Sequence, residues 1–250
     1  MTEVARKYAE LVRKTTGWFG AYPPWISLAV GDYIQVGRGG YMHAWLGSTR
    51  AWPGWGDGLP VKTAKADGHP TYFAASSCMA SANAGAGMTG PGGVSVSASI
   101  DVSFTQAGGF VLDFLGARHH RYQEVEIARR WITSAADDGW WDRSWALVTE
   151  VIDASSATIL ISSKNSSSLQ LNSSVKLPFD MAGIRLADPQ LKLGISGWKG
   201  DGFVCLCKAA TPLFKCALVK RDWKGTISGQ LQADSDYEPD AVTDDIFYNV

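Results

Sequence analysis

The sequence lacks an apolar run long enough to form a transmembrane helix. No uninterrupted stretch approaches the about 18 residues that such a helix needs. The first residues, Met1 to Lys14, are charged and do not have the apolar centre of a secretory signal. These two absences predict a protein that is made in the cytoplasm without a membrane helix.

Cysteine is scarce in the chain, which has four. Cys205 and Cys207 lie on one face of an expected strand, Cys216 follows them, and Cys78 is far away in sequence. We expect free buried thiols, because a reducing compartment disfavours disulfides. A zinc site would need closer cysteine pairs together with histidines near them, and the sequence lacks this combination.

Motifs of known catalytic chemistry are also missing. The sequence has no nucleophile elbow, no Walker loop and no His-Glu-x-x-His motif. His119 and His120 would point to opposite faces of a strand and have no carboxylate or thiol partner by motif, so we expect surface or packing histidines. Basic residues are scattered, which argues against a nucleic-acid partner. We therefore expect no enzyme, no metal and no cofactor.

Negative charge is concentrated at the end of the chain. Residues 1–224 carry 23 basic and 18 acidic residues, and residues 225–250 contain six acids but no Lys or Arg. Such a tail is typically solvated, and it can also shield a basic surface. The segment from Asp234 to Asp245 is therefore a candidate brake on whatever surface the basic body presents.

Residues 94–104 alternate strictly between apolar and polar side chains, which predicts a strand with one apolar face. Its length also matches the about 9 to 11 residues of a tilted transmembrane β-strand. We expect its partner at residues 72–84. The apolar face of this first hairpin comprises Tyr72, Ala74, Cys78, Ala80, Ala82, Val94, Val96, Ala98, Ile100, Val102 and Phe104.

A second alternating region predicts another hairpin. Its tip is expected at the polar run from Ser162 to Ser168. The apolar face comprises Ala157, Ile159, Ile161, Leu169, Leu171, Val175 and Leu177. Half-buried strands of soluble sheets show the same alternation, so the pattern alone leaves open a role in covering a core.

Residues 2–15 are predicted to form an amphipathic helix that ends before Gly17. Its basic residues Arg6, Lys7, Arg13 and Lys14 fall seven apart in pairs, so they form one stripe. A solvated helix face is one interpretation of this stripe. Contact with anionic lipid headgroups is the functional alternative.

The predicted order is helix, short strands, long hairpin, helix at residues 122–136, long hairpin, strands and tail, which indicates an α+β chain. The stretch from Trp145 to Ile152, which opens the second strand pair after a helix, resembles the pore-forming domain of the gasdermin family, and so does the first hairpin followed by a helix. Such a domain would occupy residues 1–225, with residues 226–250 as an acidic tail. The size is most similar to the short fungal homologues called regulator of cell death.

The resemblance implies a twisted antiparallel sheet with helices and two long amphipathic hairpins. It implies a soluble cytoplasmic monomer that oligomerises at the plasma membrane and inserts the hairpins as a membrane β-barrel. Arg6, Lys7, Arg13 and Lys14 match the basic first helix that touches acidic phospholipids. The fungal homologues further imply regulated cell death in allorecognition, triggered by a divergent allelic form.

Two other interpretations remain open from the residues. A soluble cytoplasmic β-rich binding protein would use the alternating strands simply to cover its core. An enzyme of unrecognised type also remains, because missing motifs exclude only known sites.

Overall fold

The computed structural model describes residues 3–23, 25–37, 42–52, 55, 59–65, 71–73, 78–84, 98–173, 186–221 and 227–231. The predicted α+β class is confirmed, because two α-helices accompany mostly antiparallel strands in these residues. The chain forms two compact units. Unit 1 comprises Met1–Leu11, Asp67–Ala117 and Ala154–Ala210, and unit 2 comprises Val12–Ala66, Arg118–Asp153 and Thr211–Val250.

The first helix, α1, runs from Glu3 to Thr16, within one residue of the predicted bounds. It ends at Gly17, which adopts a φ of +72° and donates its N–H to the carbonyl of Arg13 at 2.8 Å. A glycine takes this left-handed conformation without the steric cost that a Cβ would bring. One side of the helix is buried, at Ala5, Tyr8, Ala9 and Val12.

Unit 2 contains an eight-stranded sheet, here sheet A, with a central order β1-β15-β10-β2-β3. β9 also pairs with β10, β4 pairs with β9, and β16 pairs with β15. The strands are β1 (Phe19–Gly20), β2 (Asp32–Val36), β3 (Met42–Ser48), β4 (Val61–Lys65), β9 (Arg118–Tyr122), β10 (Trp145–Ala154), β15 (Ala210–Arg221) and β16 (Ile227–Leu231).

The second helix, α2, spans Val125–Asp137. Its predicted start at Tyr122 is wrong, because Tyr122 ends β9 and pairs with Val61 of β4. Its apolar side is buried at Ala128, Ile132 and Ala135 and contributes to the core of unit 2. Aromatic rings fill part of this core, where Trp52, Trp55, Trp131, Trp141 and Trp145 make edge-to-face or tilted contacts.

Unit 1 contains two four-stranded sheets, and every paired strand that the structure describes in them is antiparallel. Sheet B has the order β14-β11-β8-β5, and sheet C has the order β13-β12-β7-β6. The strands of sheet B are β5 (Thr71–Phe73), β8 (Phe110–Leu115), β11 (Ser156–Ser162) and β14 (Gly202–Cys207). Those of sheet C are β6 (Cys78–Ala84), β7 (Ala98–Phe104), β12 (Ser167–Ser173) and β13 (Gly194–Lys199).

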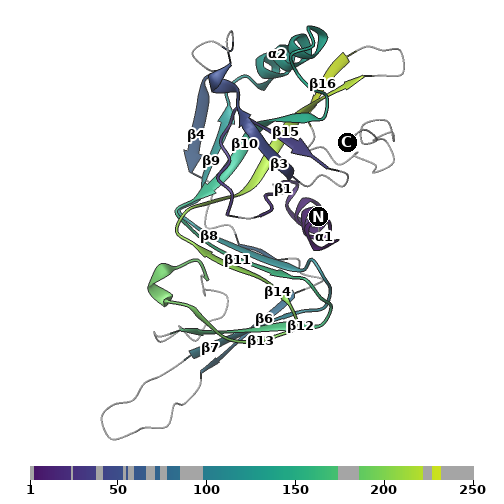
Figure 1. Cartoon of the computed structure of the whole chain (residues 1–250). Helices are drawn as coiled ribbons and strands as arrows, with labels where there is room; N and C mark the ends of the chain where they lie inside the picture. Colours follow the sequence, from purple (N-terminus) through teal and green to yellow (C-terminus); the bar gives the residue numbers. More distant parts are fainter. Residues whose placement is uncertain are drawn as a thin grey trace, which may run out of the picture. The chain divides into compact units, whose positions relative to one another are not determined.

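The two sheets of unit 1 enclose an apolar core (Figure 1). Val111 and Leu160 of sheet B pack there with Ile100, Val102 and Leu169 of sheet C. Every residue of β8 from Phe110 to Phe114 is buried, so both faces of this strand are covered. On the face away from sheet C, Phe110 meets the ring of Tyr8 on α1. Sheet B is thus the middle layer of unit 1, between α1 and sheet C.

Candidate functional site: two strand hairpins and a basic helix

The first predicted hairpin exists, with a shorter first strand. β6 pairs with β7 from Cys78 opposite Phe104 to Ala84 opposite Ala98, and residues 85–97 connect them. The expectation of one continuous strand over 72–84 is wrong, because Tyr72 belongs to β5 and pairs with Leu112 in sheet B. Ala74, Val94 and Val96 lie outside the described residues. For Tyr72, Cys78, Ala80 and Ala82 the structure describes backbone pairing alone.

The predicted tip of the second hairpin is wrong. β11 and β12 do not pair with each other, because β11 lies in sheet B and β12 in sheet C. The polar run between them forms a corner, where the hydroxyls of Ser162 and Ser167 lie 2.9 Å apart and Ser167 donates to the carbonyl of Lys164 at 2.9 Å. The actual hairpin pairs β12 with β13 across residues 174–193. Val175 and Leu177 fall in this connection, outside the described residues.

Each of four long segments therefore contributes one strand to sheet B and one strand to sheet C. The four segments are residues 71–84 (β5 and β6), 98–115 (β7 and β8), 156–173 (β11 and β12) and 194–207 (β13 and β14). They lie side by side in the same order in sheet B and in sheet C. We call these four segments the ribbon, and residues 105–109 with 163–166 its central corner.

The two central segments keep one pairing register across the central corner. Phe104 lies opposite Ser167 in sheet C, and Phe110 lies opposite Ile161 in sheet B. The step from Phe104 to Phe110 is six residues forward along one segment. Their partners, Ser167 and Ile161, are six residues apart in the opposite direction along the other segment. The ladder continues inside the corner, where Gly108 donates to the carbonyl of Ser162 at 2.7 Å and Ser162 donates to that of Gly109 at 2.8 Å. Straightening the corner would need no change of register in this pair.

The register places most apolar residues of the four segments on one face of a straight ribbon, because directly opposed residues point to the same side of a sheet. Val102 lies opposite Leu169 and Leu112 opposite Ile159. This face comprises Tyr72, Cys78, Ala80, Ala82, Ala98, Ile100, Val102, Phe104, Phe110, Leu112, Phe114, Ala157, Ile159, Ile161, Leu169, Leu171, Ile195, Trp198, Phe203, Cys205 and Cys207.

In the folded unit the corner splits this face between two sides. Ile100, Val102 and Leu169 point into the core between the sheets, whereas Phe110 points away from that core toward α1. One apolar stripe in the sequence is thus buried against two different neighbours. Simple alternation along the chain does not reveal this division, since it carries no information about where a long strand bends.

The opposite face of the ribbon carries most of its polar side chains. Gln170 donates to the carboxylate of Asp101 at 3.0 Å, directly across the ladder. Asp113 is buried in sheet B and accepts the backbone N–H of Ala187 at 2.7 Å. Its neighbour Thr158 donates to the carbonyl of Leu186 at 2.7 Å. This face also carries apolar side chains: Val111, Leu160 and Val204 pack in the core between the sheets, and Leu115 and Leu206 share the face.

The four basic residues predicted to contact lipid all lie on α1, but they are not equally accessible. Arg6 and Lys14 are exposed, whereas Lys7 and Arg13 are half-buried. The guanidinium of Arg13 lies 5.7 Å from the centre of the Phe19 ring. Arg6 and Lys14 are therefore the basic side chains of this stripe that a surface ligand meets first.

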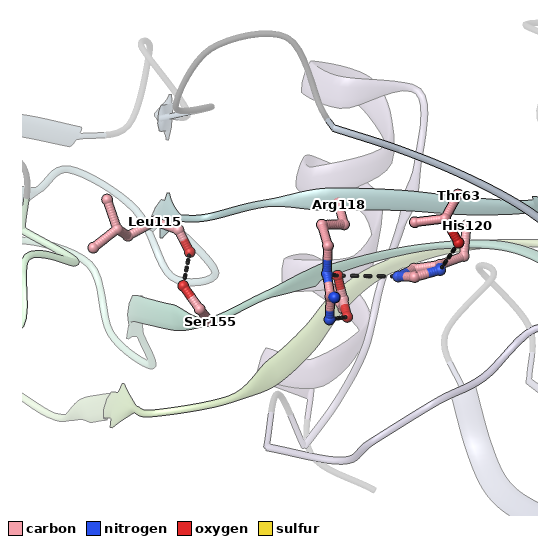
Figure 2. Close-up of polar contacts among 6 residues, drawn as sticks. Thr63, Leu115, Arg118, His120 and Ser155 are labelled. Carbon is pink, nitrogen blue, oxygen red and sulfur yellow. Dashed lines mark hydrogen bonds and ion pairs between the residues drawn. The ribbon is translucent and has the colours of Figure 1, made fainter.

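The structure supplies carboxylate partners to both histidines, which the sequence did not indicate. His119 Nε2 lies 2.8 Å from Glu150 Oε2. His120 Nε2 lies 3.2 Å from Asp153 Oδ1, as Figure 2 shows. Thr63 Oγ1 contacts His120 Nδ1 at 2.9 Å. Asp153 also binds Arg118 through two hydrogen bonds and raises the pKa of that guanidinium. These contacts tie β4, β9 and β10 together in unit 2.

Figure 2 also shows Ser155 at the start of the sheet B ladder in unit 1, where its hydroxyl donates to the carbonyl of Leu115 at 2.8 Å. Across the residues that the structure describes, no cluster of three or more His, Cys, Asp or Glu side chains is arranged to hold a metal ion.

The cysteines differ from the expectation of free thiols. Cys205 and Cys207 form a disulfide on β14, with their Cα atoms 5.6 Å apart. This separation lies within the range that a disulfide spans, and two residues on one face of a strand bring their side chains together. Cys216 is a buried free thiol, as predicted, and burial raises its pKa to about 12.

No protein-family model matches the sequence, and no curated protein matches it either. Among the described residues, neither helix has the length and apolar character needed to span a membrane.

Proposed function

We propose that the protein permeabilises membranes rich in acidic phospholipids by inserting the ribbon of unit 1. The observation that carries this proposal is the single register of the central segments, which gives a straight ribbon one apolar face. At about 3.3 Å per residue, residues 98–115 would extend over about 60 Å, well beyond the thickness of a bilayer's hydrocarbon core. The polar face, with Asp101, Gln170 and Asp113, would face water.

Buried polar side chains lie on the face of sheet B that points toward sheet C. They favour this function over the alternative in which the strands only cover a core. Asp113 and Thr158 are buried there and depend on the backbone of residues 186–187 for hydrogen bonds. Burying a charge or a hydroxyl costs free energy unless a partner is supplied, so apolar residues would fill a simple core at lower cost. In an inserted ribbon the same side chains would line an aqueous path.

Insertion requires several copies of the chain. The outer segments of the ribbon, 71–84 and 194–207, each pair with one neighbour in the strand order. In hydrocarbon every unpaired backbone group costs several kcal/mol. We propose that the segment 194–207 of one copy pairs with the segment 71–84 of the next, so that a ring of copies satisfies both edges.

The resemblance to gasdermins adds a cellular role to the proposal. We propose that α1 recruits the protein to acidic lipid at the plasma membrane, and that assembly causes regulated cell death when a divergent allelic form is encountered. The acidic tail from Asp234 to Asp245, which lies outside the described residues, is the proposed brake in the absence of that form.

Dye release from liposomes tests the proposed activity. The purified protein is added to vesicles that hold a self-quenched dye, with either a zwitterionic lipid alone or the same lipid plus an anionic one. Release confined to the anionic vesicles, with ring-shaped oligomers in the membrane fraction, is the expected result. Absence of release from both, for the full chain and for a chain truncated before Asp234, would contradict the proposal and favour a binding protein.

A further inference from the structure

The N-terminal part of α1 is seated on sheet B at the central corner. Ala5, Tyr8 and Ala9 are fully buried within the helix face that packs inward. The ring of Tyr8 meets the ring of Phe110 edge to face, with centroids 5.9 Å apart. Phe110 is the first residue of β8, directly after the corner segment 105–109.

The corner backbone approaches the helix so closely that it leaves no room for a side chain. Gly108 has a φ of +81°, and a Cβ at this position would lie 2.6 Å from the Cβ of Lys7 and 3.0 Å from its carbonyl carbon. Glycine is therefore required here by both conformation and space. The close approach joins the bend of the ribbon to the position of α1.

The surface against which α1 packs is part of the apolar face that a straight ribbon would present to lipid. Phe110 shares that face with Leu112 and Phe114, and its ladder partner is Ile161. All four side chains are nearly fully buried in the folded unit. If α1 left this position, apolar surface would be exposed next to the corner, and the helix would stop restraining Gly108.

We propose that α1 is a clamp that keeps the ribbon bent, and that its displacement from Gly108 and Phe110 is the step that lets the corner straighten. This inference rests on the proposed function. The clamp also carries the exposed Arg6, next to Lys7 whose backbone touches the corner. An acidic membrane therefore attracts the same helix that sheet B holds, so that lipid binding and release of the ribbon are one coupled event.

A variant that removes one aromatic contact distinguishes the effect of the clamp from the effect of a general loss of stability. Tyr8→Ala deletes the ring that meets Phe110 and leaves every charge of α1 in place. Ile132→Ala is the matched control, because Ile132 is an equally buried apolar residue on α2 in the core of unit 2. Tyr8→Leu, which keeps apolar bulk, replaces the alanine variant if that variant does not fold.

Two readouts are compared across the variants. The first is amide hydrogen exchange without lipid at Gly108 and Ser162, whose N–H groups bond across the corner. The second is the lag before dye release from anionic vesicles. The clamp predicts that Tyr8→Ala speeds exchange at these amides about tenfold and shortens the lag, while Ile132→Ala leaves both near the wild-type values.

The outcomes distinguish the clamp from the proposed function. If both variants speed amide exchange equally, the clamp is overturned, because lost stability alone would then explain the faster exchange. Dye release by the wild type with neither readout changed in Tyr8→Ala would also overturn the clamp and leave the proposed function standing. Faster exchange in Tyr8→Ala alone, with no dye release from any protein, would support the clamp while the proposed function fails.

Discussion

Gly108 donates its backbone N–H to the carbonyl oxygen of Ser162 at 2.7 Å, in the bend where the two central segments pass from one sheet to the other. This bond lies between the Phe104–Ser167 pair of sheet C and the Phe110–Ile161 pair of sheet B. The bend therefore interrupts the direction of the strands without breaking the register of their ladder. In the proposed insertion, straightening at this point would convert the two packed sheets into one long ribbon.

A charge on the apolar face of the ribbon should slow insertion. Ile195 is opposite Leu171 on that face and is already 55% exposed, so Ile195→Lys should leave the folded unit stable. A Lys that crosses the bilayer midplane facing lipid costs about 2 to 4 kcal/mol, which corresponds to roughly 30- to 1,000-fold in rate. The initial rate of dye release measures this effect.

Ser196→Lys is the control for that variant, since it adds the same charge at the next residue. Ser196 donates to the carbonyl of Gln170 and is exposed. Its variant should release dye within about threefold of the wild-type rate, because a lysine on the water side avoids the hydrocarbon. Equal slowing by both variants would show that the predicted lipid face is wrong.

The exposed basic residues of α1 should set the affinity for acidic vesicles. Each such residue near an anionic surface is worth about 1 kcal/mol, so Arg6→Glu with Lys14→Glu should weaken vesicle binding by at least about 30-fold. Raising the salt concentration should weaken wild-type binding in the same direction. Co-sedimentation with vesicles measures both effects.

A second double variant, Arg130→Glu with Arg143→Glu, makes the same change in net charge at exposed positions outside α1 and outside the ribbon. It should bind vesicles nearly as well as the wild type. If the two double variants lose affinity equally, net charge rather than the helix governs membrane contact.

Cys216 should resist thiol reagents at pH 8 for as long as the protein stays folded. Burial raises its pKa from the ordinary 9.0 to about 12, so the folded state favours the protonated thiol. This preference stabilises the fold fully below pH 9 and is lost as the pH rises toward 12. In a Cys78→Ser variant, labelling should therefore occur at the rate of unfolding and reach one thiol per chain without reductant. Three labelled thiols in the unfolded, unreduced protein would contradict the disulfide between Cys205 and Cys207.

Local pattern predicted the elements of this fold better than their partners. The alternation over 98–104 and the spacing of Tyr8 and Val12 correctly indicated a strand and an amphipathic helix, because both follow from periods of two and 3.6 residues. The polar run from Ser162 to Ser168 has the composition of a hairpin tip but forms a bend instead. Turn composition alone does not determine which strands pair afterwards.

The contacts around the corner are not visible in the sequence. The close approach of Gly108 to Lys7 joins residues about one hundred positions apart, and a single glycine gives no sign of what lies against it. The carboxylates that meet His119 and His120 come from β10, some thirty residues later. Neither relationship has a local spacing rule, so both required the folded chain.

Lipid exposure of single positions along β7 tests the central claim most directly. An environment-sensitive dye is attached to single cysteines at residues 99 to 104, in a chain without Cys78 and Cys216, and nitroxides on the lipid acyl chains act as quenchers. Insertion predicts quenching at Ile100, Val102 and Phe104 but not at Ser99, Asp101 and Ser103, on anionic vesicles alone. Equal quenching at neighbouring positions, or none at any position under conditions of full membrane binding, would contradict insertion of the ribbon.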